Sequence, residues 1–581
     1  MGCPLAALGF VYALHQAIHA TNTTITAVNR KAKILAYMDD MYVMVHPEHL
    51  RQTMDNIKHN LTQIGLHLNE DKTTVWHVDE SVRNHIRQQG YPTTDNPTVL
   101  KTTTLPIPII PAPTATQGAL ITQHGPEHSA VYQRRTKAAQ RIMQLQHAGL
   151  NHHTAQSLWR TYTASDATFL ARTTGIDPQA AQALDSITTQ LWQHWLGMET
   201  IPPIPHQLIW QPLKEGGMGF TAAKHLQGTA LLASWRQVGM SILETTELAD
   251  LQTLVDKAPQ IKRQLIAAAQ SLPPNTLPDL LTMQTHTPPP KLTQKILATQ
   301  IRAAELAQTK DQMTTTQRAV MNSAGGPGAG AWLMTPVEQI LPLTNEHFRI
   351  ACRLRLALQQ THQPTKPTCQ QRGLQTTCNR PTDPLLHHVL ACPCGPGPIR
   401  RHDALRDAWQ LIIADFIGFE PLAEQLLPHI PNTTSPSTRV TRNTEVRADL
   451  AIPTTTNLKY MDITVATPMK QEFMRSNAAA TTPGIAVAHA ERVKHVHYEP
   501  YSVTPLAMET FGRWGEEALQ FLRSLTHTHE TWMSDTTRHS DIAPPTTTNV
   551  FQTLSTILQR ENARIIHSYT QRPETYADPT L

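Results

Sequence analysis

The stretch AYMDDMYVMV, residues 36–45, places two adjacent carboxylates, Asp39 and Asp40, inside an apolar run that is typical of β-strands. Neighbouring negative charges repel each other, and strands disfavour aspartate. Two short strands over residues 33–46 would expose both acids at the tip of a hairpin. There they can hold a divalent cation such as Mg²⁺, which prefers oxygen ligands and relieves the repulsion. The pair alone leaves an ordinary acidic turn open as the alternative.

The composition favours a large, mostly helical α+β protein. The chain has 581 residues, enough for three or four domains, with 40 % hydrophobic and only 5 % aromatic residues. Its net charge of +4 permits a polyanionic partner without requiring one. No apolar run reaches about 18 residues, so we expect no membrane span. Because no Lys or Arg precedes the apolar start, we also expect no signal peptide and a nuclear or cytoplasmic location.

Two motifs flank the acidic pair. GCPLAALGF, residues 2–10, is a Gly-x-Pro turn that opens a helix, and IGLHLNEDKTTVWH, residues 64–77, has a Gly-Leu-x-Leu-Asn stretch before Lys72. Together with the tetrad Tyr-Met-Asp-Asp, in this order, they resemble the palm of reverse transcriptases. The resemblance implies that Asp39 binds the catalytic magnesium, that Asp40 is an auxiliary acid and that Lys72 assists the leaving pyrophosphate. It also implies a nucleotide and primer pocket formed by Gly2, Pro4, Tyr37 and Met38.

The same family carries another metal-binding Asp on an earlier strand. This sequence begins at the Gly-x-Pro turn, with Met1 where the family usually has Gln. Two-metal phosphoryl transfer needs carboxylates from both strands. We therefore expect residues 1–105 to form the rear part of a palm that polymerises weakly or not at all by itself.

The middle of the chain, residues 116–345, is predicted to form a helical thumb and connector. Residues 195–235 combine several prolines, the turn KEGGMGF and an Ala-rich helix that ends at Trp235. This order of features resembles the region after the thumb in non-LTR retrotransposon polyproteins. NSAGGPGAGAW, residues 322–332, is typical of a flexible link.

Five of the six cysteines lie between positions 352 and 394, interspersed with histidines. This clustering favours a metal site in a reducing compartment over a disulfide framework. Thiolate and imidazole ligands suit a tetrahedral, structural Zn²⁺. The preferred ligand set is Cys369, Cys378, His388 and Cys392. The substitutes that stay open are Cys394, His387 and His402, and the alternative without metal is buried free cysteines beside surface histidines.

A second acidic pattern follows in EVRADLAIPTTTNLKYMDITVATP, residues 445–468. Asp449 and Asp462 lie in two strand-like runs that a polar turn joins, so a hairpin can bring both to one Mg²⁺ (or Mn²⁺). AHAERVKHVHY, residues 488–498, predicts a helix with Glu491, Lys494 and Tyr498 on one face. The alternative is two acids of an edge strand and a solvated helix face.

These C-terminal patterns resemble the zinc element and the restriction-like PD-(D/E)xK nuclease of non-LTR retrotransposons. The resemblance implies a small zinc element over 346–405 and an α/β nuclease over 406–530, with Asp449 and Asp462 on magnesium and Lys494 as the catalytic lysine. Glu420 is a candidate for a further acid. The Thr-rich residues 531–581 are predicted to be a polar tail with an amphipathic piece at 551–566.

The expected protein is thus a reverse transcriptase and endonuclease fragment of such an element. Its expected partners are an RNA template, target DNA and deoxynucleotides. The alternative is an inactive remnant that only binds nucleic acid.

Overall fold

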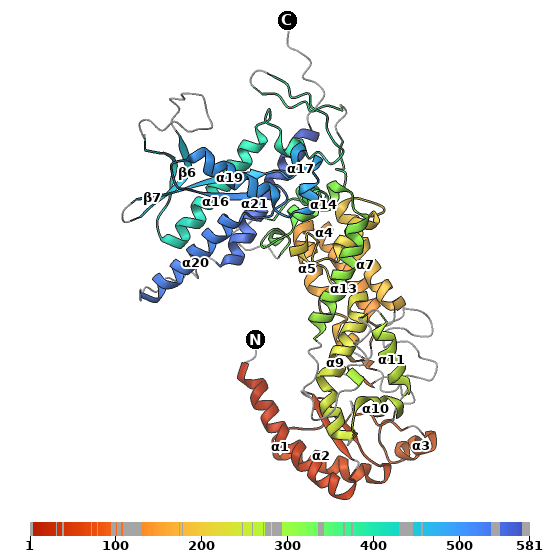
Figure 1. Cartoon of the computed structure of the whole chain (residues 1–581). Coiled ribbons are helices and arrows are strands. Elements are labelled where there is room, and N and C mark those ends of the chain that lie inside the picture. The colour runs from red at the N-terminus through yellow and green to blue at the C-terminus, as the bar shows by residue number, and fades with distance from the viewer. Residues whose placement is uncertain are drawn as a thin grey trace.

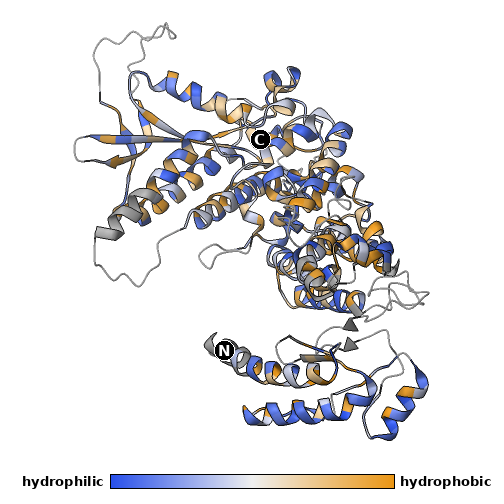
Figure 2. Cartoon of the chain, turned by 60° about the horizontal axis from the view of Figure 1, so that its bottom comes forward, coloured by the Kyte–Doolittle hydropathy of each residue, from blue (hydrophilic) through white to orange (hydrophobic). Residues whose placement is uncertain are grey.

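The chain is a mostly helical α+β protein, as predicted, with a mixed four-stranded sheet near its C-terminal end (Figure 1). The computed structural model describes residues 4–571 except for 31, 38–39, 71–72, 78, 94–99, 102–105, 108–129, 174, 177, 247, 258, 271, 273–279, 282–292, 335–341, 364–366, 374–375, 429–445, 455–456 and 536–545. Among the described helices, none combines the length and the apolar character that crossing a membrane requires, and most carry hydrophilic and hydrophobic residues side by side (Figure 2).

The N-terminal unit lies at the foot of Figure 1 and contains a short antiparallel hairpin. Its elements are α1 (Pro4–Val28), β1 (Lys33–Tyr37), β2 (Asp40–Met44), η1 (Pro47–His49), α2 (Leu50–Gln63) and α3 (Glu80–Gln88). Helices α1 and α2 pack through Leu14, Met54 and Ile57. The hydroxyls of the threonines in α1 donate to the backbone carbonyl four residues earlier, as Thr21 does to Ala17 at 2.8 Å, so these hydroxyls are hydrogen-bonded within the helix.

The connector is a column of helices between the N-terminal unit and the C-terminal sheet (Figure 1). A minor strand pair, β3 (Leu100–Lys101) and β4 (Pro106–Ile107), precedes it. Its core is rich in tryptophan, with Trp159, Trp192, Trp195 and Trp332 all buried. The elements are α4 (Ala130–His147), α5 (His152–Thr163), α6 (Thr168–Thr173), α7 (Pro178–Leu196), α8 (Pro203–Ile209), η4 (Leu213–Glu215), α9 (Ala223–Thr246), α10 (Leu251–Lys257), α11 (Pro259–Ala269), α13 (Gln294–Gln312), α14 (Thr315–Ala324), η5 (Ala331–Leu333) and α15 (Asn345–Arg355).

The Gly-rich stretch 322–332 is closely packed, and the prediction of a flexible link is wrong. The backbone N–H of Gly326 donates to the carbonyl of Lys214 at 2.7 Å, so this stretch lies on the KEGGMGF turn. A Cβ added at Gly330 would lie 2.9 Å from Leu213, and one at Gly328 would clash with the ring of Phe551. The glycines are present because three chain segments approach each other too closely for side chains.

A buried arginine links the two Gly-rich segments. Arg355, at the end of α15, donates to the carbonyls of Leu213, Gly217 and Ala324 at 2.8 to 3.1 Å. Burial lowers the pKa of Arg355 to about 10, which leaves the guanidinium charged at neutral pH. One side chain therefore provides hydrogen bonds to carbonyls of both Gly-rich segments.

The C-terminal sheet has the strand order β5-β6-β7-β8, with β8 parallel to β7 and the other pairs antiparallel. Its strands are β5 (Leu422–Leu426), β6 (Arg447–Pro453), β7 (Leu458–Ala466) and β8 (Val503–Glu509), and its helices are α16 (Gly397–Ile417), α17 (Gln471–Arg475), α18 (Ala478–Thr481), α19 (Ile485–Tyr498) and α20 (Glu516–Asp535). Met461 and Ile463 share one core with residues of α16 and α20. Because side chains alternate along a strand, Asp462 points to the opposite face.

The last helix, α21 (Thr547–Thr570), differs from the expected polar tail. Leu554 and Leu558 lie in the core beneath the sheet, while Ile565 and Ile566 lie in the core around the cysteines. In Figure 1 the helix runs between α16 and α14, so it joins the sheet to the connector. The amphipathic piece predicted over residues 551–566 lies within this helix, but its place between two cores was not predicted.

Candidate functional site

The N-terminal hairpin has the form that its sequence predicts. In the antiparallel register Tyr37 pairs with Asp40, which are the last residue of β1 and the first of β2. Pro4 begins α1. The other candidates of this region, Met38, Asp39, Lys72 and Gly2, lie outside the described residues.

Asp449 and Asp462 lie opposite each other on neighbouring strands. The antiparallel register pairs Leu450 of β6 with Met461 of β7. Asp449 precedes Leu450 and Asp462 follows Met461, so the two aspartates also face each other. Their side chains are 13 % and 5 % exposed. Burial, together with the nearby charge of Asp449, raises the pKa of Asp462. Such a carboxylate pair is stabilised by a cation between its members.

Two side chains of α19 meet the Asp462 carboxylate. The ammonium Nζ of Lys494 lies 2.6 Å from Oδ2, and the hydroxyl of Tyr498 donates to Oδ1. The hydroxyl oxygen of Tyr498 also lies 3.1 Å from the carbonyl oxygen of Arg447, and burial next to Asp462 raises the pKa of Tyr498. The two residues are four positions apart on the helix, which puts them on one face. Lys494 therefore stands beside the carboxylates, and Tyr498 fixes the orientation of one of them.

His402, which the sequence left open as a zinc ligand, reaches the acidic pair instead. Its Nε2 lies 3.0 Å from Oδ2 of Asp449, and its Nδ1 lies 3.2 Å from Asp403. The hydrogen bond to Asp449 is the largest of the effects that raise the pKa of His402 to about 9. Oδ2 of Asp449 also accepts the backbone N–H of Ile463 at 2.6 Å. At neutral pH an imidazolium thus neutralises Asp449, and a cation at the pair would compete with it.

Two other acids that the sequence singled out lie elsewhere. Glu491 shares α19 with Lys494, but its carboxylate accepts the backbone N–H of Glu517 at 3.2 Å and so caps α20. Glu420 accepts a hydrogen bond from Gln410 at 3.1 Å in the exposed turn before β5. Neither carboxylate contributes to the Asp449–Asp462 pair.

The preferred zinc ligands come together in the segment between α15 and α16. The sulfur atoms of Cys369, Cys378 and Cys392 and a ring nitrogen of His388 lie within 4.8 Å of one another. Backbone bonds from Cys369 to Arg380 (2.7 Å) and from Cys378 to Gln371 (2.9 Å) close a hairpin, and η6 (Val389–Ala391) separates the other two ligands. The structure thus contains a possible Cys₃His metal site.

The geometry of the cluster fits zinc. The sulfurs of Cys369 and Cys392 are 3.7 Å apart, and that of Cys378 lies 3.2 Å from Nε2 of His388. Tetrahedral coordination with Zn–S bonds of about 2.3 Å separates neighbouring ligand atoms by about 3.3 to 3.8 Å. Burial raises the pKa of Cys392 to about 12, a cost that a bound cation reverses. Cys394 is outside the cluster, and His387 packs against Phe511.

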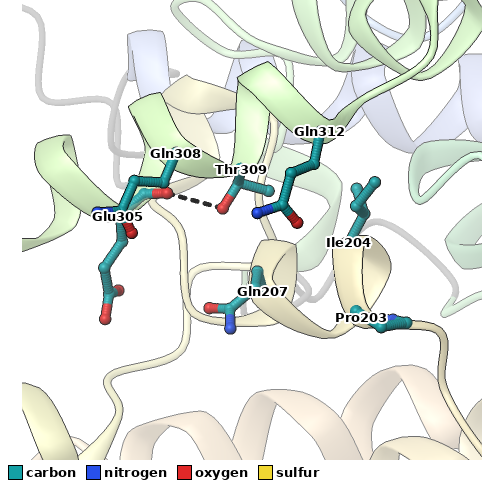
Figure 3. A pocket seen from close by; sticks show the side chains of 7 residues that line it. All are labelled: Pro203, Ile204, Gln207, Glu305, Gln308, Thr309 and Gln312. Atoms are coloured by element: carbon teal, nitrogen blue, oxygen red, sulfur yellow. Dashed lines mark hydrogen bonds between the residues drawn. The ribbon is translucent and has the colours of Figure 1, made fainter.

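A small hollow in the connector lacks such chemistry. Its volume is about 190 Å³, and it lies between α8 and α13 (Figure 3). Its one acidic lining residue, Glu305, binds His225 at 2.7 Å and Lys224 at 2.9 Å, and these partners overcome the effect of burial and lower its pKa to about 2. The hydroxyl of Thr309 donates to the backbone carbonyl of Glu305 at 2.7 Å. Because the carboxylate is already neutralised, the hollow is best described as a packing feature.

Comparison with known families assigns the N-terminal unit. Residues 1–103 match the family described as reverse transcriptase (RNA-dependent DNA polymerase), a match that includes the hairpin of Tyr37 and Asp40 and both flanking motifs. A search among curated proteins gives no match to the chain. The chain therefore carries a reverse transcriptase domain at its N-terminus, a domain type that uses a nucleic-acid template, deoxynucleotides and divalent metal.

Proposed function

We propose that the chain belongs to a non-LTR retrotransposon reverse transcriptase whose C-terminal α/β unit is a DNA-nicking endonuclease. One observation carries the nuclease assignment: Asp449, Asp462 and Lys494 converge at the sheet although they are 13 and 32 residues apart in sequence. An acid pair on adjacent strands with a lysine beside it is suited to phosphodiester hydrolysis. The reverse transcriptase domain in the same chain supports a role for that cut in DNA synthesis.

Each residue has a definable task at the phosphodiester. A divalent cation held by Asp449 and Asp462 would supply the Lewis acid that neutralises the charge of the scissile phosphate. Lys494 hydrogen-bonds the attacking water or a phosphate oxygen, where its ammonium stabilises the charge that develops in the transition state. Tyr498 keeps Asp462 oriented toward the pair. His402 occupies Asp449 in the absence of the cation and leaves it when the cation binds.

The two ends of the chain would then act in sequence. The nick frees a 3′ hydroxyl on the target DNA, and this hydroxyl primes DNA synthesis on bound RNA at the hairpin of Tyr37, Asp39 and Asp40. Asp39 holds magnesium with Asp40 as an auxiliary acid, and Lys72 assists the leaving pyrophosphate. The remaining candidates of the pocket, Gly2, Pro4 and Met38, contact nucleotide and primer. The Cys₃His cluster holds structural zinc between connector and sheet.

Replacing Lys494 by Ala is expected to lower the rate of nicking of supercoiled plasmid DNA by about 10²-fold, the scale for one transition-state contact. Lys494→Arg should retain part of the rate, because it keeps the charge but changes the geometry. Gel assays in Mg²⁺ measure the rates, with Lys470→Ala, on the turn before α17, as the control. Nicking by Lys494→Ala at the wild-type rate would remove this lysine from the site.

RNA-templated primer extension tests the polymerase assignment. We expect weak extension with Mg²⁺ and deoxynucleotides that depends on Asp39, so Asp39→Ala should reduce it to background through loss of a metal ligand. The matched control is Asp55→Ala on α2, an exposed acid outside the hairpin. Equal extension by Asp39→Ala and wild type would contradict the assignment of that residue.

A further inference from the structure

A cavity of about 370 Å³ lies beside the Cys₃His cluster, where three parts of the chain meet. His347 of α15 and Gln371 of the cysteine segment form one side. The first turn of α16 supplies Gly397 and Arg400, and the last turns of α21 supply Arg564 and His567. Neither the acidic pair nor the four metal ligands line it, so it is separate from the sites described above.

The cavity has an excess of positive charge. Arg400 and Arg564 line it, and Arg560 of α21 is close enough to lower the pKa of His347 together with Arg564, in addition to burial and His567. One carboxylate, Glu561, lines the cavity and binds Arg564 at 2.5 Å. Glu346 is also near His347, but it is paired with Arg349 at 2.9 Å. Two lining arginines thus share one lining carboxylate, an arrangement that favours an anionic ligand.

The first turn of α16 adds its helix dipole to this field. Pro396 at the N-cap has no side chain that can accept a hydrogen bond, and no side-chain cap is present. The helix has 21 residues, so the positive end of its dipole is fully developed. A Cβ at Gly397 would lie 2.6 Å from Ile565, which shows how closely α21 approaches this end. Pro396 and Pro398 have no backbone N–H, and that of Arg400 donates to the carbonyl of Pro396 at 3.1 Å. The backbone donors of this turn are therefore Gly397 and Ile399, and donors at a helix N-terminus are favourable for phosphate.

Buried polar atoms at the cavity lack partners, which is an independent sign of a ligand. Gln371 is only 4 % exposed, and its Oε1 forms no hydrogen bond among the described residues. The same holds for Nδ1 of His567. As placed, this oxygen is an acceptor; a half-turn of the amide exchanges it with the nitrogen, and in that orientation Gln371 donates to an anion. A buried amide without a partner costs free energy that a bound oxygen ligand would recover.

We propose that this cavity binds a phosphate group, and that the phosphate belongs to the backbone of the nucleic acid on which the chain acts. Arg400 and His402 are two positions apart on α16, so they point to nearly opposite sides of its first turn. One side carries the cavity and the other reaches Asp449. The cavity and the acidic pair therefore lie on opposite sides of the same helical turn, and we infer that one nucleic acid contacts both. This assignment rests on the proposed nucleic-acid function, and it adds a positioning contact outside the acidic pair.

The double variant Arg400→Gln with Arg564→Gln tests the proposal. Binding of a short fluorescein-labelled DNA duplex is followed by anisotropy without Mg²⁺, between about 50 and 200 mM salt. We expect weaker binding, about 5- to 10-fold at the lower salt, and a slope of log K against log salt that is smaller by about one. The matched control, Arg263→Gln with Arg523→Gln, removes the same charge from two other exposed arginines. Affinity and slope equal to those of wild type would overturn the proposal.

Inorganic phosphate distinguishes the two sources of the ligand. If inorganic phosphate competes with the duplex for the wild-type protein and has less effect on the double variant, the backbone assignment is supported. Calorimetry measures binding of phosphate alone. If the double variant loses this binding but binds the duplex as tightly as wild type, the cavity is a site for free phosphate and the backbone assignment is overturned. Because neither assay needs Mg²⁺ or nicking, failure of the nuclease assignment, read from Asp462→Asn, remains separately visible.

Discussion

Replacing Cys378 by Ser is expected to abolish zinc binding and to lower the midpoint of thermal unfolding of the C-terminal half by at least about 10 °C. Loss of one thiolate from a four-ligand site removes most of a binding free energy that reaches about 10 to 16 kcal/mol in small zinc domains. A loss of only about 3 to 5 kcal/mol of this binding free energy would lower the unfolding midpoint of a unit of this size by about 10 °C. Metal content by mass spectrometry and scanning calorimetry measure both effects.

The effect is expected to spread because the cluster lies at a junction. Cys369 and Cys392 share a core with Ile350 of α15 and with Ile565 and Tyr569 of α21. Loss of zinc therefore loosens the contacts that hold connector and last helix together. Cys394→Ser, outside the cluster, is the control and should keep one zinc per chain. Wild-type zinc content in the Cys378→Ser protein would remove the metal site from the account.

Asp462→Asn is expected to lower nicking of supercoiled DNA by at least about 10²-fold, because the amide cannot replace a carboxylate that binds the cation. The change keeps the shape of the side chain. Burial and Asp449 already raise the pKa of Asp462, so its ionised form is destabilised in the fold and a neutral amide should not lower the unfolding midpoint. Loss of activity is then separable from loss of structure.

The matched control for this variant is Glu420→Gln. Glu420 was the further acid that the sequence suggested, but its carboxylate lies in the exposed turn before β5 and contacts Gln410. The control should nick at the wild-type rate. Nicking at that rate by Asp462→Asn as well would mean that the buried acid pair is structural.

Local patterns were sufficient for several parts of the fold. The apolar alternation around Asp40 predicted the hairpin of β1 and β2, and the Cys and His spacing predicted the set that the structure gathers within 4.8 Å. The spacing of Asp449 and Asp462 predicted strands that face each other. In each case the residues that matter are close in sequence, so short-range periodicity determines where they point.

Long-range packing could not be predicted in the same way. His402 stands 47 residues before Asp449, and only the docking of α16 on the sheet brings them together. The glycines near position 328 appeared flexible in sequence because nothing local reveals Phe551, more than 200 residues later, against them. The amphipathic pattern over residues 551–566 was recognisable, but the two distant cores that α21 joins were not.

Nicking of supercoiled plasmid DNA by the purified chain, in Mg²⁺ and in Ca²⁺, tests the central claim most directly. Ca²⁺ occupies carboxylate sites but has larger, looser coordination than Mg²⁺, so it should bind without supporting the reaction efficiently. The account predicts open-circular product in Mg²⁺, little in Ca²⁺, and none above background in Mg²⁺ with the double variant Asp449→Asn and Asp462→Asn. Absence of nicking by wild type in Mg²⁺ and Mn²⁺, or equal nicking by the double variant, would contradict it.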